Sequence, residues 1–272
     1  MKRCISTVAI LAVCVAPLRA DLTIVQTMSL EGGFAAMMGG FKPPVMTTRL
    51  KGTKARTDID VMDQKLTTIV DVTAKQVTML NAATKTANII TAGEMPGVPA
   101  GTPMPQIDVS FKPTGQTRTI DGVSCDDYAL DMTLSLAEMT GAQMPPETAA
   151  QLKDVKIVLG GTSCIAKNVP GAVEYAAFQK AAAANALDWV LKGGMPGQQI
   201  QGMDKVLAAL SSAEGLPYLT ELTLTFQGSG PMVDMMKQMG AMKMTQKVTS
   251  VTTDAIADDI FTVPADYKVE KK

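Results

Sequence analysis

The sequence predicts an α+β fold in which one antiparallel sheet is combined with two helices. Between Val45 and Thr91, short runs rich in Val, Ile and Thr are separated by turns of three to five residues. Such turns are too short for helical crossovers and favour an antiparallel meander. Two helical segments follow later, at Val173–Lys192 and Gln198–Ala213, and strand patterns resume after them.

The first twenty residues have the layout of a secretory signal peptide. A basic start precedes a mostly apolar run over Ile5–Pro17, and Ala20 stands just before the polar Asp21. The run is shorter than the roughly 20 apolar residues that span a bilayer. We therefore expect cleavage near Ala20, and we expect residues 21–272 to form a single exported β-rich domain, periplasmic or secreted.

Short strands joined by turns account for most of this domain. The expected strands are Asp21–Ser29, Val45–Lys51, Ala55–Val61, Leu66–Val72, Gln76–Leu80, Thr86–Thr91, Gln116–Ile120, Val123–Met132, Val155–Ala166, Tyr218–Gln227, Lys247–Thr253 and Ile260–Phe261. Asp121-Gly122 forms the turn between two of them, where glycine suits a positive φ. Segments rich in Met, Pro and Gly are expected as loops, over residues 31–44, 93–105, 138–147 and 228–244.

The two predicted helices differ in the faces that they present. Val173–Lys192 is rich in alanine and carries its polar residues on one narrow stripe, so we expect it to be well buried. Gln198–Ala213 has an amphipathic face made of Ile200, Met203, Leu207 and Leu210. A further short helix is expected after Pro145-Pro146.

Composition argues against a nucleic-acid partner. Removal of Lys2, Arg3 and Arg19 with the signal leaves 22 cationic against 26 anionic residues, and no basic block stands out. Nucleic-acid binding needs a concentrated positive face. Apolar residues make up 46% of the chain but aromatic residues only 4%, so aliphatic side chains and methionine must fill the core.

Two cysteines remain in the mature chain, Cys125 and Cys164. Thiols in an oxidising compartment usually pair, so we expect a disulfide between them. The alternative is two separate buried thiols. Zinc binding is not expected, because zinc takes four nitrogen or sulfur ligands and the chain has no histidine.

The lack of histidine also removes the usual general base near neutral pH. No nucleophile elbow, P-loop or dinucleotide-binding glycine motif occurs. We expect no catalytic residues, no cofactor and no enzymatic activity. The alternative is an enzyme that uses carboxylates alone, for which Asp58 and Asp60 on one strand face are the candidate pair.

Methionine is unusually frequent, with 20 residues in the chain. Thioethers are soft ligands that suit Cu(I). The candidate copper ligands lie in one short segment and are Met232, Met235, Met236, Met239 and Met242. Met244 belongs to the same crowded segment. Methionine also forms adaptable apolar surfaces and fills cores, so contact with a lipid or a partner and simple core filling are the rival interpretations.

Several motifs together resemble the bacterial exported proteins grouped as domain-of-unknown-function family 4412. They are Gly115–Gly122, Cys125 and Tyr128 just after it, Gly215–Pro217 before a late strand, and the ending Ile260–Lys268. The order of these motifs carries the resemblance. The family supplies no catalytic residue to transfer.

The early strands, with Arg49 and Arg56, also look like the lipoprotein-carrier type of exported fold. This resemblance implies a strongly curved antiparallel sheet, a half-barrel, that wraps two or more helices and can hold an acyl chain. We therefore expect a non-enzymatic binding or carrier-like module for a hydrophobic ligand or lipid. The alternatives are a periplasmic copper-binding protein and a structural or interaction protein of the cell envelope with a protein partner.

Overall fold

One large sheet forms the body of the protein in the computed structural model. The structure describes residues 20–32, 43–61, 64–91, 107–136, 152, 154–184, 211–238 and 240–271. The strands are β1 (Leu22–Glu31), β2 (Val45–Lys51), β3 (Lys54–Val61), β4 (Gln64–Asp71), β5 (Gln76–Asn81), β6 (Thr86–Thr91), β7 (Ile107–Ile120), β8 (Val123–Ser135), β9 (Lys156–Ala166), β10 (Leu216–Gln227), β11 (Met242–Thr252) and β12 (Lys268–Lys271). The helices are α4 (Ala172–Ala184), α7 (Pro231–Gln238) and the 3-10 helix η2 (Asp258–Phe261).

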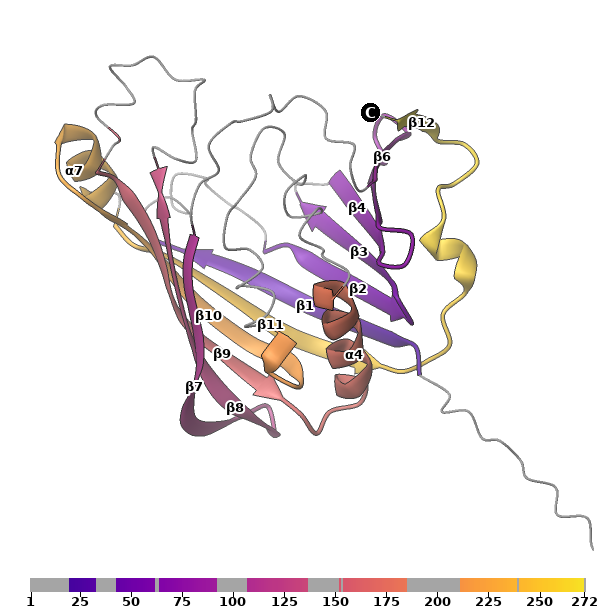
Figure 1. The fold of residues 1–272 in the computed structure, drawn as a ribbon, viewed down its shortest axis with the longest axis horizontal. Helices are drawn as coiled ribbons and strands as arrows, with labels where there is room; N and C mark the ends of the chain where they lie inside the picture. Colours follow the sequence, from indigo (N-terminus) through magenta and orange to yellow (C-terminus); the bar gives the residue numbers. More distant parts are fainter. Residues whose placement is uncertain are drawn as a thin grey trace, which may run out of the picture.

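The strands of the described residues form a 12-stranded sheet in the order β12-β6-β5-β4-β3-β2-β1-β11-β10-β9-β8-β7. Neighbouring strands are antiparallel, apart from β12, which runs parallel to β6. The sheet is curved and open, with β3–β6 on one side, β7–β10 on the other and α4 in the concavity (Figure 1). The predicted α+β, sheet-dominated fold is confirmed.

Short polar turns explain the β2–β6 meander. The Asp71 carboxylate accepts a hydrogen bond from the Ala74 backbone N–H at 2.9 Å, and the Asn81 side-chain oxygen accepts one from Ala83 N–H at 3.0 Å. In these turns, a side-chain hydrogen bond stabilises the backbone in the way that a backbone hydrogen bond otherwise would. Tight turns of this kind place consecutive strands side by side and antiparallel, and they leave no room for a helical crossover.

The sheet has two distinct faces. We call the face that carries α4 the concave face, and the opposite one the convex face. On the concave face, Phe178 and Ala182 of α4 pack against Leu22, Ile24 and Leu50. On the convex face, the segment after β11 covers β4–β6, and its core residues are Ile256 and Phe261, which pack with Ile69, Leu80 and Ala87. Helix α4 therefore covers part of the concave face over β1 and β2, and the segment after β11 covers the convex face over β4–β6.

Three sequence predictions need correction. Ile260–Phe261 is part of the 3-10 helix η2 and not a strand, because this segment crosses the convex face and Arg56 donates a hydrogen bond to the Ile260 carbonyl at 2.8 Å. Strand β7 begins at Ile107, nine residues before the predicted start at Gln116. Pro113 is tolerated inside β7 because β7 is an edge strand, and the register shifts between Pro113 and Thr117.

The third correction concerns residues 228–244, which we expected as a loop. This segment contains helix α7 and the start of β11 at Met242. Within a few residues the spacing of apolar residues changes from the helical period of α7 to the alternation of β11, so neither period stands out in the sequence. No sequence pattern indicated β12, the short parallel strand at the edge.

Other predictions fall outside the described residues. They include residues 1–19 of the predicted signal, the loop cores at 33–42, 93–105 and 138–147, and the helix after Pro145-Pro146. The helix predicted at Val173–Lys192 is described as far as Ala184, and that at Gln198–Ala213 only from residue 211.

Candidate ligand-binding cavity

A cavity of about 390 Å³ lies on the concave face, between the sheet and α4. Strands from both sides of the sheet contribute to its wall, from β1–β4 and from β7–β11. Its lining residues are Ile24, Gln26, Met46, Thr48, Leu50, Ala55, Thr57, Val70, Phe111, Leu130, Ser163, Ile165, Tyr175, Phe178, Gln179, Ala213, Gly215, Pro217, Thr220 and Gln246. None of these described lining residues is charged. A mostly apolar cavity with a few polar groups is the usual form of a small-molecule site.

Helix α4 supplies one wall of the cavity. Its Phe178 and Ala182 belong to the apolar core, and Phe178 also lines the cavity, together with Tyr175 and Gln179, which are four residues apart. The Gln179 amide donates a hydrogen bond to the Tyr175 hydroxyl at 2.8 Å. Burial raises the pKa of Tyr175, so the phenol stays neutral and keeps its own hydrogen to donate. The helix thus contributes an uncharged polar pair to an apolar wall.

A second cleft, of about 330 Å³, lies on the other side of α4. It is lined by alanines of the helix and by Lys167, Lys180 and Glu214. These charges already have partners, because Lys180 bonds Glu214 at 2.6 Å and Lys167 bonds Asp126 at 2.8 Å. Their pairing leaves this cleft less suited to recognising a charged ligand.

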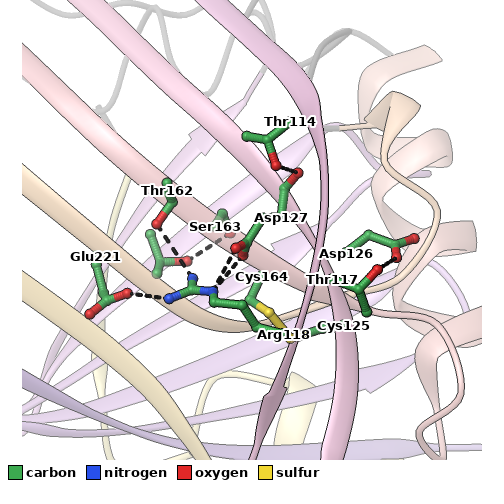
Figure 2. Close-up of a disulfide and its surroundings, with 11 residues drawn as sticks. Thr114, Thr117, Arg118, Cys125, Asp126, Asp127, Thr162, Ser163, Cys164 and Glu221 are labelled. Carbon is green, nitrogen blue, oxygen red and sulfur yellow. Dashed lines mark hydrogen bonds and ion pairs between the residues drawn. A yellow bond between two sulfur atoms is a disulfide. The ribbon is translucent and has the colours of Figure 1, made fainter.

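The predicted disulfide between Cys125 and Cys164 is present. It joins β8 to β9, with a Cα–Cα distance of 5.3 Å, and both cysteines are buried (Figure 2). Cys164 lies directly opposite Asp127, so the two cysteines are diagonal neighbours on one face. Tyr128 lies on the opposite face, where its ring stacks on Phe111 with 5.0 Å between centroids.

Arg118 crosses the sheet beside the disulfide. Its guanidinium bonds the buried Asp127 at 2.6 Å, Glu221 of β10 at 2.8 Å and, more weakly, the Thr162 hydroxyl at 3.4 Å (Figure 2). These contacts tie together β7, β8, β9 and β10. We interpret the motif around Cys125 as a structural clamp, because its polar groups bind one another.

The candidate acid pair is also built into the sheet. Asp58 is only 6% exposed and accepts bonds from Arg49 at 2.7 Å, Arg56 at 3.0 Å and the Thr67 hydroxyl at 2.6 Å. Burial raises the pKa of Asp58, but the bonds from Arg56 and Thr67 outweigh it and hold the pKa below its usual value. Asp60 is exposed on the same convex face, away from the cavity.

The candidate copper ligands fall on two elements. Met235 and Met236 belong to α7, where Met235 is 57% exposed. Met242 is the first residue of β11 and lies on the concave face, because it is opposite Leu224. The side chains of Met232 and Met239 lie outside the described residues.

Within the residues that the structure describes, no group of three or more Asp, Glu, Cys or His side chains is placed to hold a metal ion. In the same residues, no helix combines the length and the hydropathy needed to cross a membrane.

Comparisons with known proteins give no family. No protein-family model matches the chain. No curated protein matches it either. Among solved structures, the chain is similar to an uncharacterized conserved protein from Thermus thermophilus, at 8% identity and a TM-score of 0.38, over 94% of this chain and 92% of that one. The resemblance to family 4412 remains a prediction.

Proposed function

We propose that the protein is a non-enzymatic binding or carrier-like module that holds a hydrophobic ligand in the concave cavity. One observation supports this most strongly: the cavity lies between α4 and the curved sheet, and its described lining is wholly uncharged. Apolar ligands gain free energy in proportion to the area that leaves water, and an uncharged lining adds no desolvation cost for buried ions. The sheet and its helices together would enclose the ligand, as in the half-barrel that the sequence predicts.

The placement of charge on the sheet supports the same proposal. Residues that face each other across neighbouring strands share a face, so the register assigns every strand residue to one side. By this rule the charged residues of β1–β11 lie on the convex face, with Asp126 near the rim as the exception among the described strands. Charged side chains could lie on the concave face if that face were exposed to bulk water, so their near-absence there supports an enclosed binding face.

Titration with the neutral apolar dye N-phenyl-1-naphthylamine tests this function. We expect a saturable rise in fluorescence from the full chain as the dye leaves water. Thr220→Trp, which places an indole in the cavity, should weaken dye binding at least tenfold. The matched control Thr223→Trp lies on the convex face of the same strand and should leave binding unchanged.

Two results would contradict the proposal. Lack of saturable dye binding would indicate that the protein chain itself fills the cavity. Equal effects of Thr220→Trp and Thr223→Trp would place the dye elsewhere on the molecule.

A further inference from the structure

An oblique row of uncharged polar side chains crosses the concave face. We call it the polar belt, and its members are Thr57 of β3, Thr48 of β2, Gln26 of β1, Gln246 of β11, Thr220 of β10 and Ser163 of β9. Thr57 is opposite Thr48, and Gln246 is opposite Thr220, which is opposite Ser163. Gln26 is the diagonal neighbour of both Thr48 and Gln246. All six line the cavity.

At each of the two ends of the polar belt, two hydroxyls hydrogen-bond to each other. The hydroxyls of Thr48 and Thr57 are 3.2 Å apart, and those of Ser163 and Thr220 are 2.9 Å apart. At each end, one hydroxyl donates and the other accepts. Each of these four hydroxyls therefore has a protein partner.

The centre of the polar belt is different. Gln26 is only 9% exposed and lines the cavity, yet its amide has no hydrogen-bond partner among the described residues. The amide of Gln246 likewise has no hydrogen-bond partner among the described residues, and it lines the same cavity. Among the described residues, the fully buried side-chain atom without a partner is Asn88 Oδ1, so the Gln26 and Gln246 amides are still open to the contents of the cavity, whether water or a ligand. The belt centre therefore presents donors and acceptors that the contents of the cavity must satisfy.

Apolar zones flank the polar belt on both sides. On one side, Ile24 and Leu50 lie under α4. On the other side, Met46 follows Thr48 on the concave face of β2, and Leu130 of β8 and Phe111 of β7 also line the cavity. Methionine adapts its shape to varied apolar partners. The lining therefore changes from apolar to polar and back to apolar across the cavity.

From this pattern we infer that the polar belt recognises the ester or amide group of an uncharged acyl amphiphile, whose apolar parts lie in the flanking zones. The inference rests on the proposed function and names its ligand class. A glutamine amide donates to an ester or amide carbonyl, and its oxygen accepts from an amide N–H or from a separate hydroxyl of the ligand. A pure hydrocarbon would leave Gln26 unpartnered. An ionised fatty acid would bury its carboxylate without any cation in the described lining.

Displacement of bound N-phenyl-1-naphthylamine tests the inference with two probes of equal chain length, 1-decanoylglycerol and decanoate, at pH 7.5. We expect the uncharged glyceride to displace the dye at a concentration about tenfold lower than decanoate. Gln26→Leu should weaken glyceride binding about tenfold, as calculated with the dissociation constant of the dye measured for the same variant. Gln246→Leu provides a second, less buried test, and Gln76→Leu, which lies on the convex face of β5, is the matched control.

The outcomes separate this inference from the proposed function. Equal displacement by decanoate, or full glyceride affinity in both glutamine variants, would overturn the role of the polar belt while dye binding continued. Loss of dye binding in the unaltered protein would overturn the proposed function itself. A cavity that takes up only water would give neither dye binding nor displacement.

Discussion

At the scale of single residues, Asp58 is the most constrained charge in the described part of the molecule. It joins β2, β3 and β4 through Arg49, Arg56 and Thr67. Arg56 also donates to the carbonyl of Ile260, so the same cluster holds η2 against the sheet. A buried carboxylate with several partners stabilises the fold only while it is ionised.

We predict that Asp58→Asn lowers the free energy of unfolding by about 2 to 4 kcal/mol at pH 7, because two arginines lose their buried partner. The folded pKa of Asp58 lies below the unfolded one. The stabilisation is therefore present above about pH 4 and is lost as the pH falls through the folded pKa. Urea denaturation from pH 3 to 8 should show the two proteins converging only at acid pH, whereas the exposed control Asp60→Asn follows the unaltered protein throughout.

The disulfide could be predicted from the sequence, whereas the Asp58 cluster could not. Cys125 and Cys164 are the two cysteines outside the predicted signal, so one pairing was available. The partners of Asp58 depend on which residues of β2 and β4 lie opposite β3, and the sequence does not give that register.

Reduction of the Cys125–Cys164 bridge should lower the free energy of unfolding by about 4 kcal/mol on the chain-entropy model, since the bridge closes a loop of 39 residues. The Cys125→Ala, Cys164→Ala double variant should show the same loss, measured by urea denaturation. Equal stability of oxidised and reduced protein would argue against the bridge as a clamp.

At the scale of elements, β9 contains a glycine that the sheet geometry requires. A Cβ atom at Gly161 would overlap the backbone carbonyl of Glu221 on β10, whereas one at Gly160 would meet only a side-chain oxygen of Asp131 at 3.2 Å. Glycine inside a strand often marks such a close backbone approach. The sequence showed two adjacent glycines but not which of them was needed.

Gly161→Ala should therefore destabilise the protein more than Gly160→Ala, because the backbone of β10 must move while the Asp131 side chain can rotate. Thermal unfolding monitored by circular dichroism measures both. We expect the melting temperature to fall by several degrees more for Gly161→Ala, about 2–4 °C for each kcal/mol in a chain of this size. Equal losses would contradict the close approach of β9 and β10.

The C-terminal segment is the element that sequence patterns described least well. It is held by Lys51, which donates to the Ile256 carbonyl at 2.6 Å, and by the Asp21 carboxylate, which accepts from Ile256 N–H at 2.7 Å. These partners are more than 200 residues away in sequence. By contrast, β2 and β6 have the predicted bounds, because local turns define them.

Phe261→Ala should lower the free energy of unfolding by about 3 kcal/mol, since it opens a cavity in the cluster of Ile69, Leu80 and Ala87. Hydrogen exchange should then become faster in β5 and β6, which this segment covers. If hydrogen exchange became faster in η2 alone, the segment would add no protection to the sheet.

At the scale of the whole molecule, the two faces of the sheet differ in charge, because nearly all charged residues of the described strands lie on the convex face. Alternation within each strand can be read from the sequence, and it separates Arg56 and Asp58 from Thr57. The polar belt could not be predicted, because it depends on the pairing of β1 with β11, whose residues are more than 200 positions apart. The long-range register therefore creates the uncharged cavity on which the functional proposal depends.

The most direct test of this account is native mass spectrometry of the full chain, expressed in a bacterial host and purified without detergent. The account predicts an adduct that denaturation releases as an uncharged acyl lipid, and that Thr220→Trp removes while Thr223→Trp retains it. A protein whose measured mass equals that of the polypeptide alone, and which takes up no 1-decanoylglycerol when it is added, would contradict the account.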